Sequence, residues 1–151
     1  MSEKIAVIGL GYVGLPLLLG LSRHFDHVVG FDIDQRRVEA LRGGHDWTGE
    51  TEDVLLKASK AKLTNNPDDL VDCTFFIATV PTPIDEAKRP NLKPILSACQ
   101  TIGTALKGHK TKDGGRVPLI VFESTVYPGL TEELCGEKNC RAFGSQTTHR
   151  I

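Results

Sequence analysis

The sequence lacks the features that mark several large classes of protein. Its formal net charge is only −1, so no excess of positive charge predicts a nucleic-acid surface or a membrane-binding face. Its strongest apolar run, residues 15–21, is far too short to cross a bilayer. The start of the chain shows no signal-peptide pattern, and we therefore expect a protein of the reducing cytoplasm.

The cysteines are scattered along the sequence. The cysteines, at positions 73, 99, 135 and 140, form no Cys-x-x-Cys pair, so we expect neither disulfides nor a zinc site. Cys73 and Cys99 fall in apolar segments and are interpreted as core residues. Cys135, Cys140 and His149 match no common zinc-ligand spacing, and no metal is predicted.

What the sequence does contain is a regular alternation of short apolar segments and helical patterns. At 151 residues and 40% hydrophobic, the chain can form one domain with a buried core. Strands are expected at about 4–9, 27–32, 63–64, 73–79 and 117–122, helices at about 12–24, 35–42, 51–59, 92–107 and 130–135, and an exposed loop at 45–50. This alternation predicts an α/β fold, a Rossmann-type doubly wound parallel sheet in a single domain.

A glycine motif follows the first expected strand. Gly9, Gly11 and Gly14 form G-x-G-x-x-G, in which the first glycine turns tightly, the second lets a pyrophosphate approach the backbone, and the third packs the next helix on the strand. That helix offers unpaired N–H groups to the phosphates. The motif alone is weak evidence, but its position between a strand and a helix is the one that the dinucleotide fingerprint requires.

An acidic residue ends the second expected strand. Asp32 follows Gly14 by 18 residues, near the spacing of about 20 at which a carboxylate accepts hydrogen bonds from the adenosine ribose. A carboxylate there repels a 2′-phosphate and favours NAD over NADP, whereas Arg36 or Arg37 can receive such a phosphate. The alternative interpretation makes Asp32 the N-cap of the following helix.

Two further polar segments follow expected strands. Pro81-Thr82-Pro83 comes after the strand at 73–79, and Ser124-Thr125 after the strand at 117–122. Parallel sheets bind ligands outside the carboxyl ends of their strands, so we expect these segments to meet the glycine turn and Asp32 at one edge. Thr82 is held rigidly between two prolines, which suits a positioning role; the alternatives are a turn residue for Thr82 and an N-cap for Thr125.

Four blocks of sequence, in order, resemble the NAD-binding half of the UDP-glucose/GDP-mannose dehydrogenase family. They read VIGLGYVGLP (7–16), VGFD (29–32), VPTP (80–83) and ESTVYPGLTEE (123–133). Within that family the chain is most similar to the UDP-N-acetylhexosamine 6-dehydrogenases of bacterial polysaccharide synthesis. The resemblance implies that Tyr12 and Val13 contact the cofactor through the glycine turn, that Asp32 holds the ribose, and that Arg37 lies beside the adenosine.

The resemblance also implies roles near the nicotinamide. Thr82 would lie next to the ring and help to position a water or substrate oxygen, which makes it the candidate catalytic residue. Ser124 and Thr125 would bind the nicotinamide side of the cofactor. Members of the family oxidise the hydroxymethyl group of a sugar nucleotide to a carboxylate with two NAD, through a cysteine thiolate in the second half of the enzyme.

Family members are roughly twice as long as this chain or longer, and they form homo-oligomers. We therefore expect residues 1–136 to form the NAD-binding domain and residues 137–151 to be an atypical tail from a frameshift, a truncation or a vector. The UDP-sugar substrate is expected only in the full-length enzyme, and the isolated chain is expected to bind NAD weakly.

Two other functions fit part of the pattern. A stand-alone nucleotide-sensing module accounts for the glycine turn and Asp32 but gives no role to Thr82 or to Ser124-Thr125. The cofactor half of another dehydrogenase, acting on UDP-glucose, GDP-mannose, 6-phosphogluconate or a 3-hydroxyacid, shares the first strand and the glycine turn.

Overall fold

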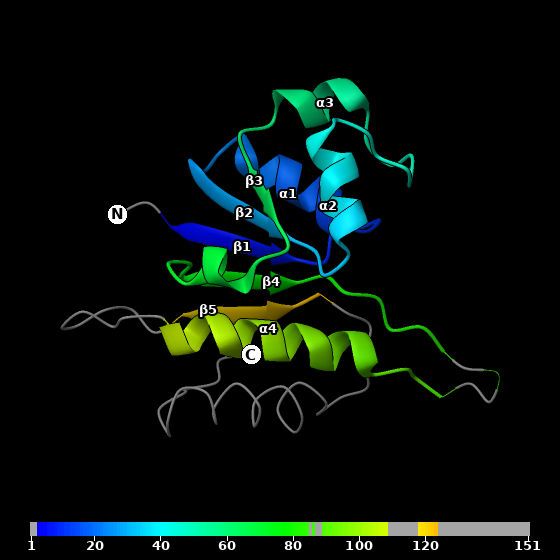
Figure 1. The fold of residues 1–151 in the computed structure, drawn as a ribbon, viewed down its shortest axis with the longest axis vertical. Coiled ribbons are helices and arrows are strands. Elements are labelled where there is room, and N and C mark those ends of the chain that lie inside the picture. Colours follow the sequence, from blue (N-terminus) through cyan, green and yellow to red (C-terminus); the bar gives the residue numbers. More distant parts are fainter. Residues whose placement is uncertain (1–2, 85, 87–88, 109–117, 124–151) are drawn as a thin grey trace.

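The computed structural model describes residues 3–84, 86, 89–108 and 118–123. In this part of the chain the strands form one parallel sheet in the order β3-β2-β1-β4-β5 (Figure 1). The strands are β1 (Lys4–Ile8), β2 (His27–Phe31), β3 (Lys62–Thr64), β4 (Phe75–Ala78) and β5 (Leu119–Phe122). The strand order reverses at β1, because β2 and β3 lie on one side of it and β4 and β5 on the other. Sheets of this kind bind ligands at such a reversal, beyond the carboxyl ends of the strands.

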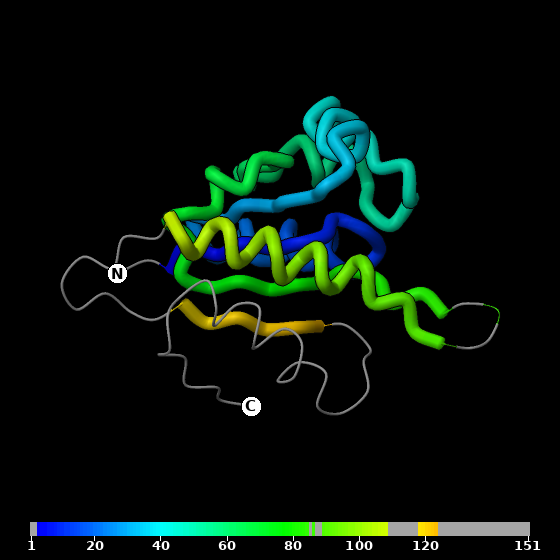
Figure 2. Tube along the Cα trace, turned by 60° about the horizontal axis from the view of Figure 1, so that its bottom comes forward, coloured from blue at the N-terminus to red at the C-terminus, as the bar shows by residue number. Residues whose placement is uncertain are grey.

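Helices cover both faces of the sheet. They are α1 (Gly14–Ser22), α2 (Gln35–Arg42), α3 (Asp53–Ala58) and α4 (Lys93–Gly108), with a short 3-10 helix, η1 (Pro67–Leu70). Side chains of α1, α2 and α3 contribute to one large core cluster, those of α4 and η1 contribute to a second, and α4 also contributes to a small third cluster. Figures 1 and 2 show the first group near β2 and β3, and α4 running alongside β4 and β5. The predicted doubly wound parallel sheet is confirmed.

The central strand shows why its sequence is apolar throughout. Ile5 and Val7 point into the core cluster beneath α1, while Ala6 and Ile8 point into the cluster beneath α4. All four are 5% exposed or less. A parallel strand covered on both faces needs a continuous apolar run instead of the polar–apolar alternation of a strand with one wet face.

The main differences from the sequence prediction lie at the ends of elements. β4 begins at Phe75, so Cys73 precedes the strand instead of opening it, although it is buried as expected. α1 begins at Gly14 and not at residue 12, because Tyr12 and Val13 still belong to the glycine turn. The helix predicted at 130–135 and the tail at 137–151 lie outside the described residues.

The connection from β4 to α4 leaves the body of the molecule. Its two arms project together in both views (Figures 1 and 2), and they are tied by an antiparallel bridge between Ile84 and Pro90 and by a hydrogen bond of 2.7 Å from Asn91 N–H to the Pro83 carbonyl.

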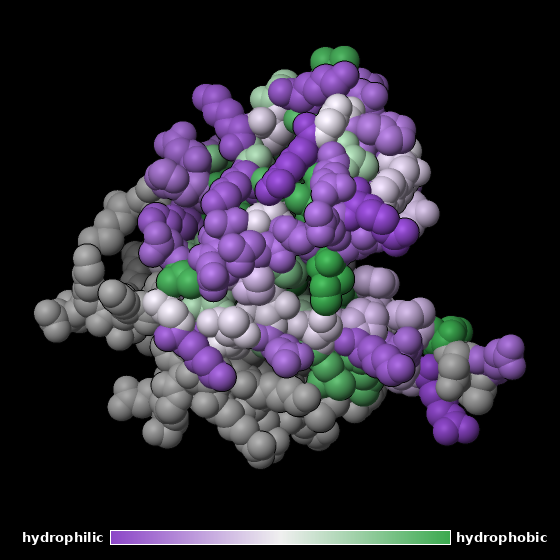
Figure 3. All heavy atoms as spheres, in the orientation of Figure 1, coloured by the Kyte–Doolittle hydropathy of each residue, from purple (hydrophilic) through white to green (hydrophobic). Residues whose placement is uncertain are grey.

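The face shown in Figure 3 is largely hydrophilic around α2, with separate hydrophobic side chains at the surface. None of the described helices is both long and apolar enough to cross a membrane.

Candidate cofactor-binding site

The turn after β1 is fixed to the sheet by its backbone. Gly9 has a φ of +96°, in the left-handed region that favours glycine. Its N–H donates a hydrogen bond of 2.8 Å to the carbonyl of Phe31 at the end of β2. This bond extends the β1–β2 ladder by one residue and sets the point at which the chain leaves the sheet.

Thr79, directly after β4, clamps the same turn from the other side. Its hydroxyl donates to the Gly9 carbonyl at 2.8 Å and approaches the Ile8 carbonyl at 3.2 Å. A Cβ on Gly14 would overlap the Gly9 carbonyl oxygen and crowd the Thr79 hydroxyl. Only glycine therefore lets α1 begin this close to the turn.

Gly11 is different, because a Cβ built there lies more than 4 Å from the surrounding atoms of the described residues. Its freedom from side-chain bulk is not required by the protein's own packing. The backbone there faces open space just before the N-terminus of α1, where a phosphate can approach unpaired N–H groups.

Asp32 joins the glycine turn to the start of α2. Its Oδ2 accepts a hydrogen bond from the Leu10 N–H at 2.9 Å, and its Oδ1 accepts one from the Asp34 N–H at 2.9 Å. A carboxylate has about four acceptor positions, so two hydroxyls of a ligand can still be bound. The N-cap of α2 is Asp34, whose carboxylate accepts from the Arg36 N–H at 3.0 Å; the alternative interpretation of Asp32 as that cap is wrong.

Arg37 lies beneath this turn, in the first part of α2. It is only 3% exposed, and its Nε donates to the Leu10 carbonyl at 2.8 Å. Its Nη1 lies 2.8 Å from Asp46 Oδ1, with both side chains almost wholly excluded from water. The guanidinium carbon is 5.2 Å from the centre of the Trp47 ring, a cation–π distance.

The loop between α2 and α3 supplies the partner of Arg37, which corrects the prediction that residues 45–50 are all exposed. Asp46 is buried, and its carboxylate accepts hydrogen bonds from the Thr48 N–H (3.0 Å), the Thr48 hydroxyl (2.7 Å) and the Thr51 N–H (3.0 Å). Burial alone raises the pKa of Asp46, but the Thr48 bonds and the charge of Arg37 outweigh it and hold the pKa below its usual value. Asp46 is therefore a buried carboxylate at neutral pH.

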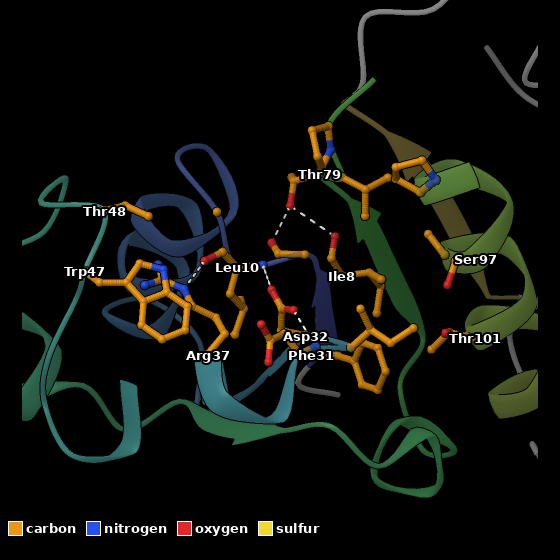
Figure 4. Close-up of a pocket in the computed structure, with 18 residues that line it drawn as sticks. Ile8, Leu10, Phe31, Asp32, Arg37, Trp47, Thr48, Thr79, Ser97 and Thr101 are labelled. Carbon is orange, nitrogen blue, oxygen red and sulfur yellow. Dashed lines mark hydrogen bonds between the residues drawn. The ribbon is translucent and has the colours of Figure 1, made fainter. Parts of the chain in front are cut away.

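These groups surround a cavity of about 380 Å³ at the carboxyl edge of the sheet. Asp32, Arg37 and Trp47 lie on one side of it, and Ser97 and Thr101 of α4 lie on the other (Figure 4). The floor is formed by the ends of β1 and β4. A mostly apolar space with polar groups at its margins is typical of a small-molecule site.

The remaining predicted site residues lie outside this cavity or outside the described part of the chain. Tyr12 and Val13 lie in the glycine turn between Gly11 and Gly14, and 68% and 57% of their surfaces are exposed. Thr82 is half-buried and comes directly after Pro81, which lines the cavity. Ser124 and Thr125 come just after β5 but are not among the described residues. The structure thus brings together the glycine turn, Asp32 and Arg37.

Sequence reasoning gave no role to Thr79, Ser97 or Thr101. The two residues of α4 are four positions apart and therefore share a face of the helix, which is a pattern visible in the sequence. The spacing of Asp46 and Thr48 is that of an Asx turn and was equally visible. What no spacing shows is that Asp46 reaches back to Arg37.

The described cysteines are not candidates for chemistry. Cys73 and Cys99 are both buried, and burial raises the pKa of the Cys73 thiol to about 11. A thiol with this pKa is almost wholly protonated at neutral pH and is a poor nucleophile. Among the described residues no cluster of three or more His, Cys, Asp or Glu side chains could hold a metal.

Comparison with known proteins agrees with this geometry. The profile described as the UDP-glucose/GDP-mannose dehydrogenase family, NAD binding domain, matches residues 3–145. The chain is 49% identical over 133 residues to UDP-N-acetyl-D-glucosamine 6-dehydrogenase of Pseudomonas aeruginosa, and 42% identical over 135 residues to protein CapL of Staphylococcus aureus. These matches cover 87% and 89% of this chain but only 29% and 30% of the relatives.

Solved structures give the same result. A UDP-glucose dehydrogenase from Pyrobaculum islandicum superposes with a TM-score of 0.82 at 25% identity, over 96% of this chain and 34% of the other. A UDP-D-ManNAc dehydrogenase from Pyrococcus horikoshii gives a TM-score of 0.77 at 30% identity, over 96% of this chain and 34% of the other. The chain spans about a third of the length of the proteins that it matches.

Proposed function

This chain belongs to the UDP-glucose/GDP-mannose dehydrogenase family and corresponds to its NAD-binding domain. We propose that it is the NAD-binding portion of a nucleotide-sugar 6-dehydrogenase. The proposed reaction oxidises the C6 hydroxymethyl group of a UDP-N-acetylhexosamine to a carboxylate with two NAD. The observation that carries the proposal is the position of Asp32, held by the Leu10 and Asp34 N–H groups directly beside the glycine turn.

The residues of the site fit NAD. The open space at Gly11 accepts a pyrophosphate beside the N-terminus of α1. Asp32, oriented by two backbone donors, has acceptor positions left for the ribose hydroxyls. When bound, NAD accepts the hydride in the oxidation. The task of the described residues is to bind and orient it, since a fixed cofactor turns hydride transfer into a reaction within one complex.

We propose Thr82 as the catalytic residue contributed by this chain. It follows Pro81, which lines the cavity at the end of β4, and a hydroxyl between two prolines has few conformations to lose. Its role would be to position a water or a substrate oxygen near the nicotinamide. Ser124 and Thr125, after the neighbouring strand β5, are proposed to bind the nicotinamide end of the same cofactor.

The choice of sugar follows from the relatives. Proteins named UDP-N-acetyl-D-glucosamine 6-dehydrogenase, from Pseudomonas aeruginosa and Salmonella typhi, are 49% and 47% identical to this chain. A UDP-N-acetyl-D-mannosamine dehydrogenase of Methanococcus maripaludis is 34% identical. These identities favour UDP-N-acetylglucosamine as the substrate. From the sequence resemblance we further propose a role in bacterial polysaccharide biosynthesis, a cytoplasmic location and a homo-oligomeric full-length enzyme.

The proposal is tested by titrating NAD into the chain and following the fluorescence of Trp47, the sole tryptophan, which lines the cavity and is half exposed. We expect saturable quenching of the tryptophan fluorescence. We expect Asp32→Asn to weaken the affinity for NAD, measured in this way, at least tenfold. Asp72→Asn is the matched control, because Asp72 precedes β4 at the opposite edge of the sheet, with an 84% exposed side chain. Quenching that is absent, or equally weak in both variants, would contradict NAD binding at this site.

Thr82→Ala separates a dehydrogenase domain from a nucleotide sensor. In the full-length enzyme we expect this change to lower kcat for the oxidation of UDP-N-acetylglucosamine while leaving the Kd for NAD within a few-fold. A sensor would lose its ligand through Asp32 substitutions and be indifferent to Thr82. The 151-residue polypeptide is expected to produce no NADH from this sugar, and turnover by it would overturn the assignment of catalysis to the full-length enzyme.

A further inference from the structure

Arg37 lines the cavity near Asp32, at what we call its ribose end, and Arg36 is its neighbour in the chain. An arginine here can bind the 2′-phosphate that distinguishes NADP from NAD. Whether it does so depends on whether its guanidinium is free and reachable. Arg36 is exposed, and its guanidinium forms an ion pair with Asp34 at 3.2 Å. Asp34 itself lines the cavity, so this pair brings no net positive charge to the site.

Arg37 is the stronger candidate, because its charge is buried at the cavity wall. Neither Nη1 nor Nη2 has an aligned hydrogen bond to an acceptor among the described residues. Nη1 nevertheless lies 2.8 Å from Asp46 Oδ1, so the contact is an ion pair by distance and charge. A buried guanidinium with unused N–H groups is what a phosphate would require.

Two residues of the α2–α3 loop keep this guanidinium from acting in that way. Asp46 neutralises its charge, and the Trp47 ring covers it at 5.2 Å (Figure 4). Asp46 is itself immobilised by hydrogen bonds from Thr48 and Thr51. The ion pair is therefore a built feature of the loop and not a chance surface contact.

We propose that Asp46 and Trp47 are specificity-determining residues that make this cavity reject a 2′-phosphorylated dinucleotide, by neutralising and covering the guanidinium of Arg37. The inference rests on the proposed binding of NAD. With Arg37 neutralised, the ribose end presents the carboxylates of Asp32 and Asp34, of which Arg36 balances one. The net field there is negative and repels a phosphate dianion.

The test compares the affinities of NAD and NADP, measured by calorimetry on the full chain, in variants of this pair. Asp46→Asn keeps an acceptor for Thr48 but removes the charge beside Arg37. We expect the ratio of NADP to NAD affinity to rise about tenfold, the order expected when one positive charge acts on a phosphate near a protein surface. The gain should shrink with added salt, because it is electrostatic.

Two further variants keep the test decisive if Asp46→Asn folds poorly. Trp47→Leu uncovers the guanidinium at a half-exposed position, and we expect a rise of about threefold in the same ratio. The double variant Asp46→Asn with Arg37→Met removes both charges, and its ratio should return to that of the unmodified chain. Structural damage that weakens the binding of NAD and NADP equally cancels in the ratio of their affinities.

An unchanged ratio in folded Asp46→Asn and in Trp47→Leu would overturn the inference, and so would a rise that persists in the double variant. A failure of the underlying function looks different. In that case the unmodified chain would bind neither NAD nor NADP, while the inference fails only when NAD binds and the ratio does not respond.

Discussion

At the residue scale, each glycine of the G-x-G-x-x-G motif is required for a different physical reason. Gly9 needs its positive φ, Gly14 needs the absence of a Cβ because the Gly9 carbonyl and Thr79 occupy the space, and Gly11 has no such need within the protein. A residue required by packing and a residue required by a ligand can therefore be separated by substitution, although both belong to one motif.

We predict opposite outcomes for Gly11→Ala and Gly14→Ala. Gly11→Ala should leave the free energy of unfolding within about 1 kcal/mol, since nothing opposes the added methyl group, but should weaken NAD binding. Gly14→Ala should lower the free energy of unfolding by about 3 kcal/mol or more through overpacking. Denaturant unfolding and NAD titration measure the two effects.

Gly20→Ala is the matched control for both. Gly20 is an exposed residue of α1, and no atom of the described residues that surround it lies within 4 Å of an added Cβ. It is not one of the residues that line the cavity. The change should stabilise the protein by about 0.5–1 kcal/mol by improving helix propensity. If Gly11→Ala destabilised the chain as much as Gly14→Ala, the assignment of Gly11 to the ligand would be wrong.

At the scale of elements, the site depends on ties between separate segments of the chain. The hydroxyl of Thr79 ties the end of β4 to the turn after β1, and Asp46 ties the α2–α3 loop to α2. Such ties position the glycine turn and the ribose end more accurately than either segment could alone.

Thr79→Val is predicted to loosen the glycine turn. The valine has the shape of threonine but no hydroxyl, so the free energy of unfolding should fall by about 1 kcal/mol and NAD binding should weaken. Thr79→Ser keeps the hydrogen bond and should retain NAD affinity. Equal affinities for NAD in the two variants would contradict the role of the hydroxyl.

The Asp46 tie also predicts a pH dependence. The pKa of Asp46 is lowered in the folded state, so the stability that it contributes is fully present above the unfolded pKa of about 3.9 and is lost as the pH falls through the folded pKa below that value. At pH 7 Asp46→Asn should lower the free energy of unfolding by about 3 kcal/mol, because it leaves the buried Arg37 unpaired. The difference between variant and unmodified chain, followed by denaturant melts from pH 7 to pH 2.5, should narrow only below about pH 4.

The whole molecule places its functional groups on one edge of a parallel sheet. The glycine turn follows β1, Asp32 follows β2, and Pro81 follows β4. The core on both faces of the sheet holds these strand ends in register, so the distances between the groups depend on the entire fold. Binding at this edge should consequently stabilise the molecule as a unit.

We predict that NAD raises the melting temperature of the chain. At a concentration of about 100 times Kd, ligand binding adds about 2.7 kcal/mol to the free energy of unfolding, which corresponds to about 5–10 °C for a domain of this size. Thermal melts with NAD, and with AMP as a fragment control, measure the shift. No shift at saturating NAD would contradict the site.

The sequence by itself determined the architecture and the nature of the cofactor. The continuous apolar runs of β1 and β4, the glycine motif and the acid after β2 are local patterns, and each follows from short-range steric and hydrophobic rules. These rules suffice because a parallel sheet brings the carboxyl ends of all its strands to one edge, whichever loops connect them. The first residues of α1 and β4 were misplaced because neither the glycine motif nor the apolar run at 73–79 shows at which residue the helix or the strand begins.

Only the tertiary structure decided what becomes of Arg37. In the sequence it was an arginine that could receive a 2′-phosphate, and Asp46 belonged to a loop expected to be exposed. The fold buries both together and places the Trp47 ring against Arg37. Whether a charge is free or neutralised depends on its neighbours in space, and in this cavity the decisive neighbour comes from another element of the chain.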